Sequence, residues 1–106
     1  MDFKQLQKEI HENAVKKGFW ESYNTPEKLA LIHSEVSEAL ESYRDGDMSY
    51  CQNGDDHPCG FPIELADIVI RVMDLAEWLS IDLEKYIKVK HDFNKTRPYK
   101  HGGKKI

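Results

Sequence analysis

The sequence predicts an all-α protein, an antiparallel bundle of about four helices in a single domain spanning residues 1–106. Two observations on the pattern support this fold class. Apolar residues recur at steps of three and four along four separate stretches, and no stretch alternates apolar and polar residues as a half-buried strand would. A third observation concerns length: a chain of 106 residues seldom divides into two cores, so one domain is expected.

The first helix is expected over residues 2–18. Apolar residues recur in it at helical spacing, with charged residues between them, which is typical of an amphipathic helix. Gly18 is the expected end, because glycine readily adopts the left-handed conformation that terminates helices.

The second helix is expected to begin at Pro26 and to run to about Arg44. The hydroxyl of Thr25 is a capping group, and proline is favoured at the first helical position. Gly46 follows the last apolar residue of the pattern and is the natural stop.

Residues 45–60 form the longest predicted loop, with three glycines and one proline and little periodicity.

The chain starts without the apolar core of a signal peptide, so we expect a cytoplasmic protein whose two cysteines, Cys51 and Cys59, stay reduced. A zinc site is not favoured, because no fourth ligand lies near Cys51, His57 and Cys59. A calcium loop is not favoured either, because Tyr50 occupies its glycine position.

The third helix, expected over residues 62–79, is apolar on nearly every side. A helix of this kind is buried on most faces, whereas the outer side of a helix in a lone small bundle should be polar. We therefore expect a second copy of the chain to cover it, in a homodimer or homotetramer. The polar exceptions in this helix are Glu64, Asp67, Arg71, Asp74 and Glu77.

Asp82 is expected to cap a fourth helix over residues 83–94, and a basic tail follows over about 95–106. Residues 85–106 hold eight Lys or Arg and one acidic residue, a net charge of +7. Residues 1–84 hold seven Lys or Arg and eighteen acidic residues, a net charge of −11. The sum of −4 speaks against general nucleic-acid binding, and the chain as a whole is too polar for a membrane span.

Two pairs of acidic residues have the spacing that places side chains on one helical face. Glu35 and Glu38 lie three residues apart in the second helix, and Glu64 and Asp67 repeat the spacing in the third. The first pair alone is also typical of a solvated helix surface. The second pair lies in an apolar helix, where a carboxylate needs a partner. Four carboxylates that converge from neighbouring helices would need a cation, and their oxygens select Mg²⁺ or Mn²⁺.

The sequence resembles the MazG-like all-α nucleoside triphosphate pyrophosphohydrolases. The resemblance rests on ExxE at Glu35–Glu38, on ExxD at Glu64–Asp67 and on the run ELADIVIRVMDLAEWLSIDLEKYIKVKHDFNKTRPYKHGGKK. It implies a dimer or tetramer that uses Mg²⁺ to hydrolyse a (deoxy)nucleoside triphosphate to the monophosphate and pyrophosphate. It also implies that the four carboxylates are the Mg²⁺ ligands. Ser34 stands where the family usually has a further Glu.

The resemblance suggests roles for other residues as well. A carboxylate not fully engaged with metal could accept the proton from water, and we favour Glu38 over Glu35. Arg71 is either an ion-pair partner of Asp67 or a phosphate contact. Candidate phosphate contacts near the C-terminus are Lys90, Asn94, Arg97 and Lys100, which could serve a neighbouring subunit.

The candidates for recognition of the nucleobase are residues that precede the first carboxylate pair in the sequence. Aromatic faces stack on nucleobases and an imidazole can read a base edge. His11 and Trp20 resemble a His and a Trp that line the base pocket in some relatives, whereas Phe19 is expected in the core.

Two rival functions remain to be compared with this hypothesis. A di-iron bundle requires Glu-x-x-His, and no His in this chain follows a Glu at that spacing. A non-catalytic helical module that binds a partner or nucleic acid through the basic C-terminal segment would explain the charge of that segment. It would leave Glu64 and Asp67 without a purpose.

Overall fold

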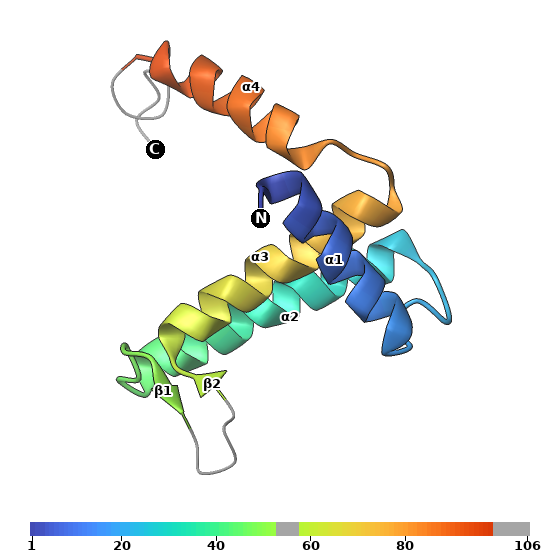
Figure 1. Ribbon diagram of the computed structural model, residues 1–106. Helices are drawn as coiled ribbons and strands as arrows, with labels where there is room; N and C mark the ends of the chain where they lie inside the picture. The colour runs from blue at the N-terminus through green and yellow to red at the C-terminus, as the bar shows by residue number, and fades with distance from the viewer. Residues whose placement is uncertain (53–57, 99–106) are drawn as a thin grey trace.

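The computed structural model describes residues 1–52 and 58–98 (Figure 1). Four helices make up most of this part, and each begins and ends within two residues of its predicted bounds, which confirms the all-α class. They are α1 (Phe3–Lys16), α2 (Thr25–Arg44), α3 (Phe61–Trp78) and α4 (Leu83–Lys95).

A short hairpin interrupts the helical pattern between α2 and α3, where only a loop was predicted. Strand β1 (Cys51–Gln52) pairs antiparallel with β2 (Pro58–Cys59). Strands of two residues are too short to show alternation, so the sequence pattern could not indicate them.

Cys59 is disulfide-bonded, and the expectation that it stays a free thiol is therefore wrong. The backbone register of the hairpin places Cys51 directly opposite Cys59.

Side-chain caps fix where three of the helices begin. Asn24 Oδ1 accepts a hydrogen bond from the backbone N–H of Glu27 at 3.1 Å, so the cap of α2 is an amide oxygen and not the Thr25 hydroxyl that was predicted. Thr25 is instead the first residue of the helix. Asp2 and Asp82 cap α1 and α4 in the same manner, as the sequence predicted for Asp82.

Helix α3 lies at the centre of the packed part of the molecule. It runs antiparallel beside α2, and α1 crosses the end of this pair (Figure 1). The innermost cluster contains Ala14 of α1, Trp20, which follows α1, and Leu75 of α3, with Ile32 of α2 packed against it. Because α3 contacts both neighbours, its carboxylates are held at fixed positions relative to those of α2.

Helix α4 stands apart from the three packed helices (Figure 1). None of its residues is buried, so a bundle of four packed helices does not form within one copy of the chain. Its amphipathic pattern calls for an apolar partner surface, and in one copy of the chain the other three helices do not provide it. Its exposed apolar side chains are Tyr86, Ile87, Val89 and Phe93.

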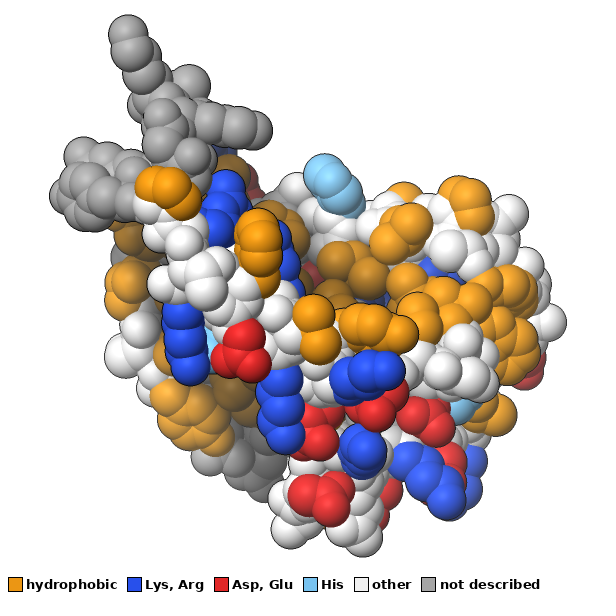
Figure 2. Space-filling model, turned by 90° about the horizontal axis from the view of Figure 1, so that it is seen from above, with side chains coloured by type: hydrophobic (Ala, Val, Ile, Leu, Met, Phe, Trp, Pro, Cys, Tyr) orange, Lys and Arg blue, Asp and Glu red, His pale blue; other side chains and the backbone are white. Residues whose placement is uncertain are grey.

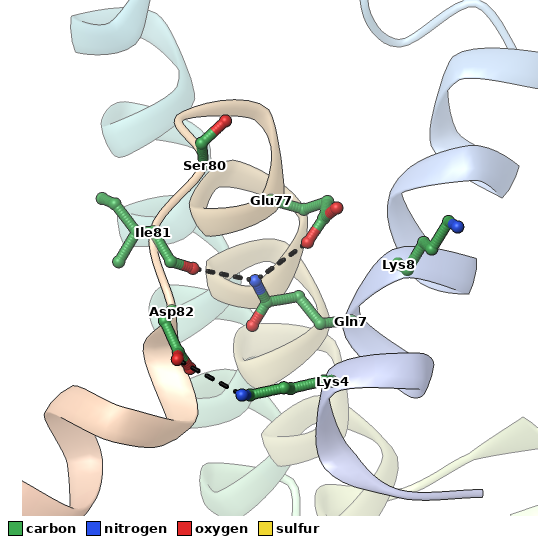
Figure 3. Close-up of a pocket in the computed structure, with 7 residues that line it drawn as sticks. All are labelled: Lys4, Gln7, Lys8, Glu77, Ser80, Ile81 and Asp82. Carbon is green, nitrogen blue, oxygen red and sulfur yellow. Dashed lines mark hydrogen bonds and ion pairs between the residues drawn. The ribbon is translucent and has the colours of Figure 1, made fainter.

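The turn that leads into α4 is held to α1 by polar contacts around a cavity of about 380 Å³ (Figure 3). Gln7 is only 4% exposed, and its Nε2 donates to Ile81 O at 3.1 Å and to Glu77 Oε1 at 3.2 Å. Lys4 forms an ion pair with Asp82 at 3.4 Å nearby. The buried amide therefore connects α1 to the segment between α3 and α4.

Gln7→Leu is expected to destabilise the protein by about 1–3 kcal/mol, because it removes two partly buried hydrogen bonds, each of which contributes about 0.5–1.5 kcal/mol. Urea denaturation followed by circular dichroism measures this change. Gln5→Leu is the matched control on α1, since Gln5 is exposed and its loss should change stability by no more than about 0.5 kcal/mol. Equal effects of the two substitutions would contradict a structural role for the Gln7 amide.

Candidate metal centre

The antiparallel pairing of α2 and α3 brings together the carboxylates that the spacing singled out. Glu35 of α2 and Glu64 and Asp67 of α3 each place a carboxylate oxygen within 4.8 Å of the other two. Glu35 is only 7% exposed, and Oε2 of Glu64 is buried. Three of the four predicted ligands thus form a compact group of negative charge at the interface of two helices.

Glu38, the fourth predicted ligand, lies beside this group and is exposed to solvent. Repulsion from Glu35 raises the pKa of Glu38 above its ordinary value of 4.5, and the hydrogen bond between the two side chains, partial desolvation and the charges of Glu64 and Asp67 act in the same direction. All four carboxylates therefore interact electrostatically, with Glu38 at the solvent side.

Arg71 provides a cation against this cluster. Its Nε donates to Oε1 of Glu35 at 2.7 Å, and its side chain keeps 34% of its surface exposed. The sequence left open whether Arg71 forms an ion pair with Asp67 or contacts a phosphate. In the structure Arg71 forms an ion pair with Glu35 of α2. A guanidinium carries five N–H groups, so Arg71 has donors beyond the one that Glu35 accepts.

Oxygen atoms alone make up the donor set of Glu35, Glu64 and Asp67. Carboxylate oxygens bind hard divalent cations, and close grouping of like charges is costly unless a cation offsets it. These three residues could hold a divalent cation that prefers oxygen ligands, such as Mg²⁺ or Mn²⁺, and they offer no nitrogen or sulfur ligand that would favour zinc.

Two cavities border the carboxylates. One, of about 250 Å³, extends along α3 and is lined by Glu35, Glu38 and Asp67 at one end and by Phe19 and Asp74 farther along. The other, of about 370 Å³, lies toward the hairpin. It is lined by Glu38 and Glu64 and, among other residues, by Glu41, Asp45 and Asp47.

Asp74, a polar exception on α3, lines the cavity although no site role was predicted for it. Oδ1 of Asp74 lies 2.7 Å from Nδ1 of His11 and accepts from Nε1 of Trp20 at 2.9 Å, and its Oδ2 lies 3.1 Å from the same indole nitrogen. The two predicted base-site residues thus meet on one carboxylate of α3. The sequence pattern that could have predicted a site role for Asp74 is its position, because it is a polar residue on an apolar helix, two turns beyond Asp67.

Of the two neighbouring aromatic residues Phe19 and Trp20, one lines the cavity and the other is buried in the core, and the sequence did not predict which. Trp20 is 9% exposed and stacks on Trp78, with ring centroids 4.6 Å apart and planes 16° apart. Phe19 was expected in the core but is 54% exposed and lines the cavity of about 250 Å³. Gly18, with φ of +86°, turns the chain just before Phe19, which explains why the ring leaves the core.

Three of the four predicted phosphate contacts of the C-terminal segment, Lys90, Asn94 and Arg97, lie on or directly after α4. Lys90 and Asn94 border a groove of about 380 Å³ along one face of this helix. The guanidinium of Arg97 lies 5.9 Å from the ring of Phe93, and Lys100 lies outside the described residues. Within the described part of one copy, neither cavity at the carboxylates is lined by α4.

The raised pKa of Glu38 predicts a pH-dependent effect of Glu38→Gln on stability without metal. A carboxyl whose pKa is raised on folding destabilises the folded state once it ionises, so its contribution to stability is fully present below about pH 4.5 and is lost as pH rises. Glu38→Gln should therefore have a higher melting temperature than the parent at pH 7, and the difference should vanish below about pH 4.5. Thermal unfolding in chelator from pH 4 to 8 measures this.

The matched control is Glu27→Gln, an exposed glutamate at the start of the same helix. It should show no stabilisation at pH 7. A Glu38→Gln variant that is no more stable than the parent at pH 7 would contradict the coupling of Glu38 to the cluster.

None of the described helices is long and apolar enough to span a membrane. Comparison with family models, with curated proteins and with solved structures gives no match to this chain.

Proposed function

We propose that the protein is a Mg²⁺-dependent nucleoside triphosphate pyrophosphohydrolase, which hydrolyses a (deoxy)nucleoside triphosphate to the monophosphate and pyrophosphate. The observation that carries the proposal is the group formed by Glu35, Glu64 and Asp67, whose oxygens lie within 4.8 Å of one another beside an elongated cavity. The resemblance of the two carboxylate motifs and of the C-terminal run to the MazG-like enzymes supplies the reaction.

In this proposal the carboxylates of Glu35, Glu64 and Asp67 hold Mg²⁺, with Mn²⁺ as a substitute. The bound cation supplies charge neutralisation at the phosphates and lowers the pKa of a water molecule. Glu38 accepts the proton of the water that attacks the α-phosphorus, because it is exposed at the edge of the cluster and its pKa is raised. Glu35 is the second candidate, although its pairing with Arg71 occupies one oxygen.

Arg71 is proposed to contact a phosphate through the N–H groups that Glu35 does not accept. His11 and Trp20 are proposed to shape the far end of the cavity, where both hold Asp74. Because Trp20 already stacks on Trp78, its contribution is to build the wall of the base site.

A homodimer or homotetramer is part of the proposal, because apolar side chains remain exposed on α3 and α4. Leu65 and Val69 on α3 are 46% and 52% exposed, and Phe93 on α4 is 55% exposed. Figure 2 shows hydrophobic side chains in several groups on one face of a single copy. A second copy would cover them, and its α4 would bring Lys90, Asn94, Arg97 and Lys100 toward the carboxylates.

Light scattering coupled to size-exclusion chromatography at micromolar concentration is expected to give at least twice the mass of the 12.4 kDa chain. Val69→Glu should shift the protein toward the monomer, since it places a charge in the expected interface. A stable monomer of the unaltered chain would contradict the proposed assembly.

A panel of standard and modified nucleoside triphosphates with Mg²⁺ tests the activity, with pyrophosphate and monophosphate as the products scored. We expect both products from at least one substrate and none in the presence of chelator. Orthophosphate as the first product would contradict attack at the α-phosphorus.

The second candidate function is a non-catalytic module that binds nucleic acid or a partner through the C-terminal segment. The exposed, basic α4, which stands apart from the other helices, favours it. Absence of turnover on the whole panel, together with DNA binding that weakens steeply with salt, would support this alternative over hydrolysis.

A further inference from the structure

We infer that the cavity beside the carboxylates selects nucleobases that carry an exocyclic amino group, such as cytosine and adenine, and that Asp74 reads this group. The inference rests on the proposed function, because it takes the carboxylate cluster as the phosphate end of the site. It goes further by naming the class of base and the residue that selects it.

The first step is the distance along α3. Asp67 and Asp74 are seven residues apart, so they lie on the same helical face, about 10 Å apart along the axis. The same cavity of about 250 Å³ is lined by both residues. A nucleotide whose α-phosphate lies at Asp67 has a base edge at a comparable distance, which is where Asp74 lies.

The second step is the surface on which a base would lie. Phe19 lines the same cavity, is 54% exposed, and has the guanidinium of Arg71 5.9 Å from its ring centroid. A half-exposed aromatic face stacks on any nucleobase and does not distinguish one base from another. Phe19 therefore accounts for binding of a base, and the choice between bases must come from polar groups of the cavity.

The third step is the hydrogen-bonding capacity of Asp74. An ionised carboxylate accepts about four hydrogen bonds and donates none. The structure places His11 and Trp20 on Oδ1 and the Trp20 indole also on Oδ2, so three acceptor positions are engaged and one remains on Oδ2. The side chain is 13% exposed and lines the cavity together with Phe19 and Asp67. What it presents to a base is an acceptor in a fixed orientation.

An acceptor of this kind distinguishes matched pairs of bases. Cytosine and adenine present an amino donor where uracil and hypoxanthine present a carbonyl oxygen. A carbonyl facing Asp74 would leave two acceptors opposed in a largely desolvated position, and sites built around such a polar contact reject the wrong analogue strongly. The held carboxylate cannot rotate away, because His11 and Trp20 fix it.

The test compares kcat/KM for dCTP with dUTP and for dATP with dITP, in Mg²⁺, for the unaltered protein and for Asp74→Asn. The unaltered protein should favour the amino member of each pair by about 10-fold or more. Asp74→Asn should reduce both ratios by about 10-fold, because the amide can donate to a carbonyl. Phe19→Leu should raise KM for all four substrates and leave both ratios unchanged.

Calorimetric binding of dCMP and dUMP separates this inference from the proposed function. Tighter binding of dCMP without hydrolysis of any triphosphate would support the base selection and overturn the proposed reaction. Hydrolysis with equal kcat/KM within both pairs would support the reaction and overturn the role of Asp74. The ratios of the unaltered protein decide the matter even if Asp74→Asn fails to fold.

Discussion

The variant Asp67→Asn is expected to lose Mg²⁺-dependent pyrophosphate release by about 100-fold or more. Asp67 contributes one of three carboxylates whose oxygens lie within 4.8 Å of one another. Even residues that only support metal ligands cost about 10–100-fold in affinity or activity when altered, so loss of a ligand should cost at least as much. The measurement is the initial rate of pyrophosphate release at saturating and at limiting Mg²⁺.

The variant should keep its helices, because removing a negative charge from the cluster lowers repulsion in the protein without metal. Circular dichroism therefore distinguishes loss of chemistry from loss of fold. Glu27→Gln is the matched control, with the same loss of charge on an exposed position of α2, and should retain full turnover. Glu38→Gln should also lose turnover if Glu38 accepts the proton. Undiminished turnover in Asp67→Asn would overturn the metal assignment.

The helices and the carboxylate cluster could be predicted because both depend on local spacing. Apolar periodicity and side-chain caps determine where a helix lies, and a separation of three residues places Glu35 beside Glu38 on any α-helix. The only long-range assumption was that two consecutive helices pack antiparallel. Elements that follow one another in the chain usually lie side by side, which makes that arrangement the usual one.

Contacts between distant segments could not be predicted in the same way. His11 and Trp20 lie 63 and 54 residues from Asp74, and their meeting depends on how α1 crosses α3. Phe19 and Trp20 are adjacent and both aromatic, yet one lines a cavity and the other enters the core. Which of two neighbouring rings turns inward depends on the left-handed turn at Gly18 and on the partners that Trp20 finds.

The position of α4, apart from the other three helices, could not be predicted for a different reason. Its amphipathic pattern predicts that its apolar face packs against something, but the pattern does not say whether the partner surface belongs to the same copy of the chain. In one copy the described part of α3 already presents exposed apolar residues of its own, and α4 does not cover them. Two uncovered apolar surfaces on a small chain are what a second copy would bury.

The largest expected change in stability is that of Trp20→Ala. Trp20 is 9% exposed, belongs to the innermost cluster, stacks on Trp78 and donates to Asp74. Large-to-small substitutions of buried aromatic residues cost about 3–5 kcal/mol. A domain of this size has a total stability of about 5–15 kcal/mol, so a substantial part of it would be lost. Urea denaturation at several protein concentrations measures the loss and any contribution from assembly.

Trp20→Phe is the variant that divides this cost between packing and hydrogen bonding. It keeps a ring against Trp78 but removes the indole N–H that Asp74 accepts, so we expect a loss of about 1–3 kcal/mol. Combined with Asp74→Asn, it should show a coupling energy of about 0.5–3 kcal/mol, because the two residues share one hydrogen-bonded group. Additive losses would mean that Trp20 stabilises the fold by packing alone. Coupled losses would mean that the stability of the core depends on the same carboxylate that faces the cavity.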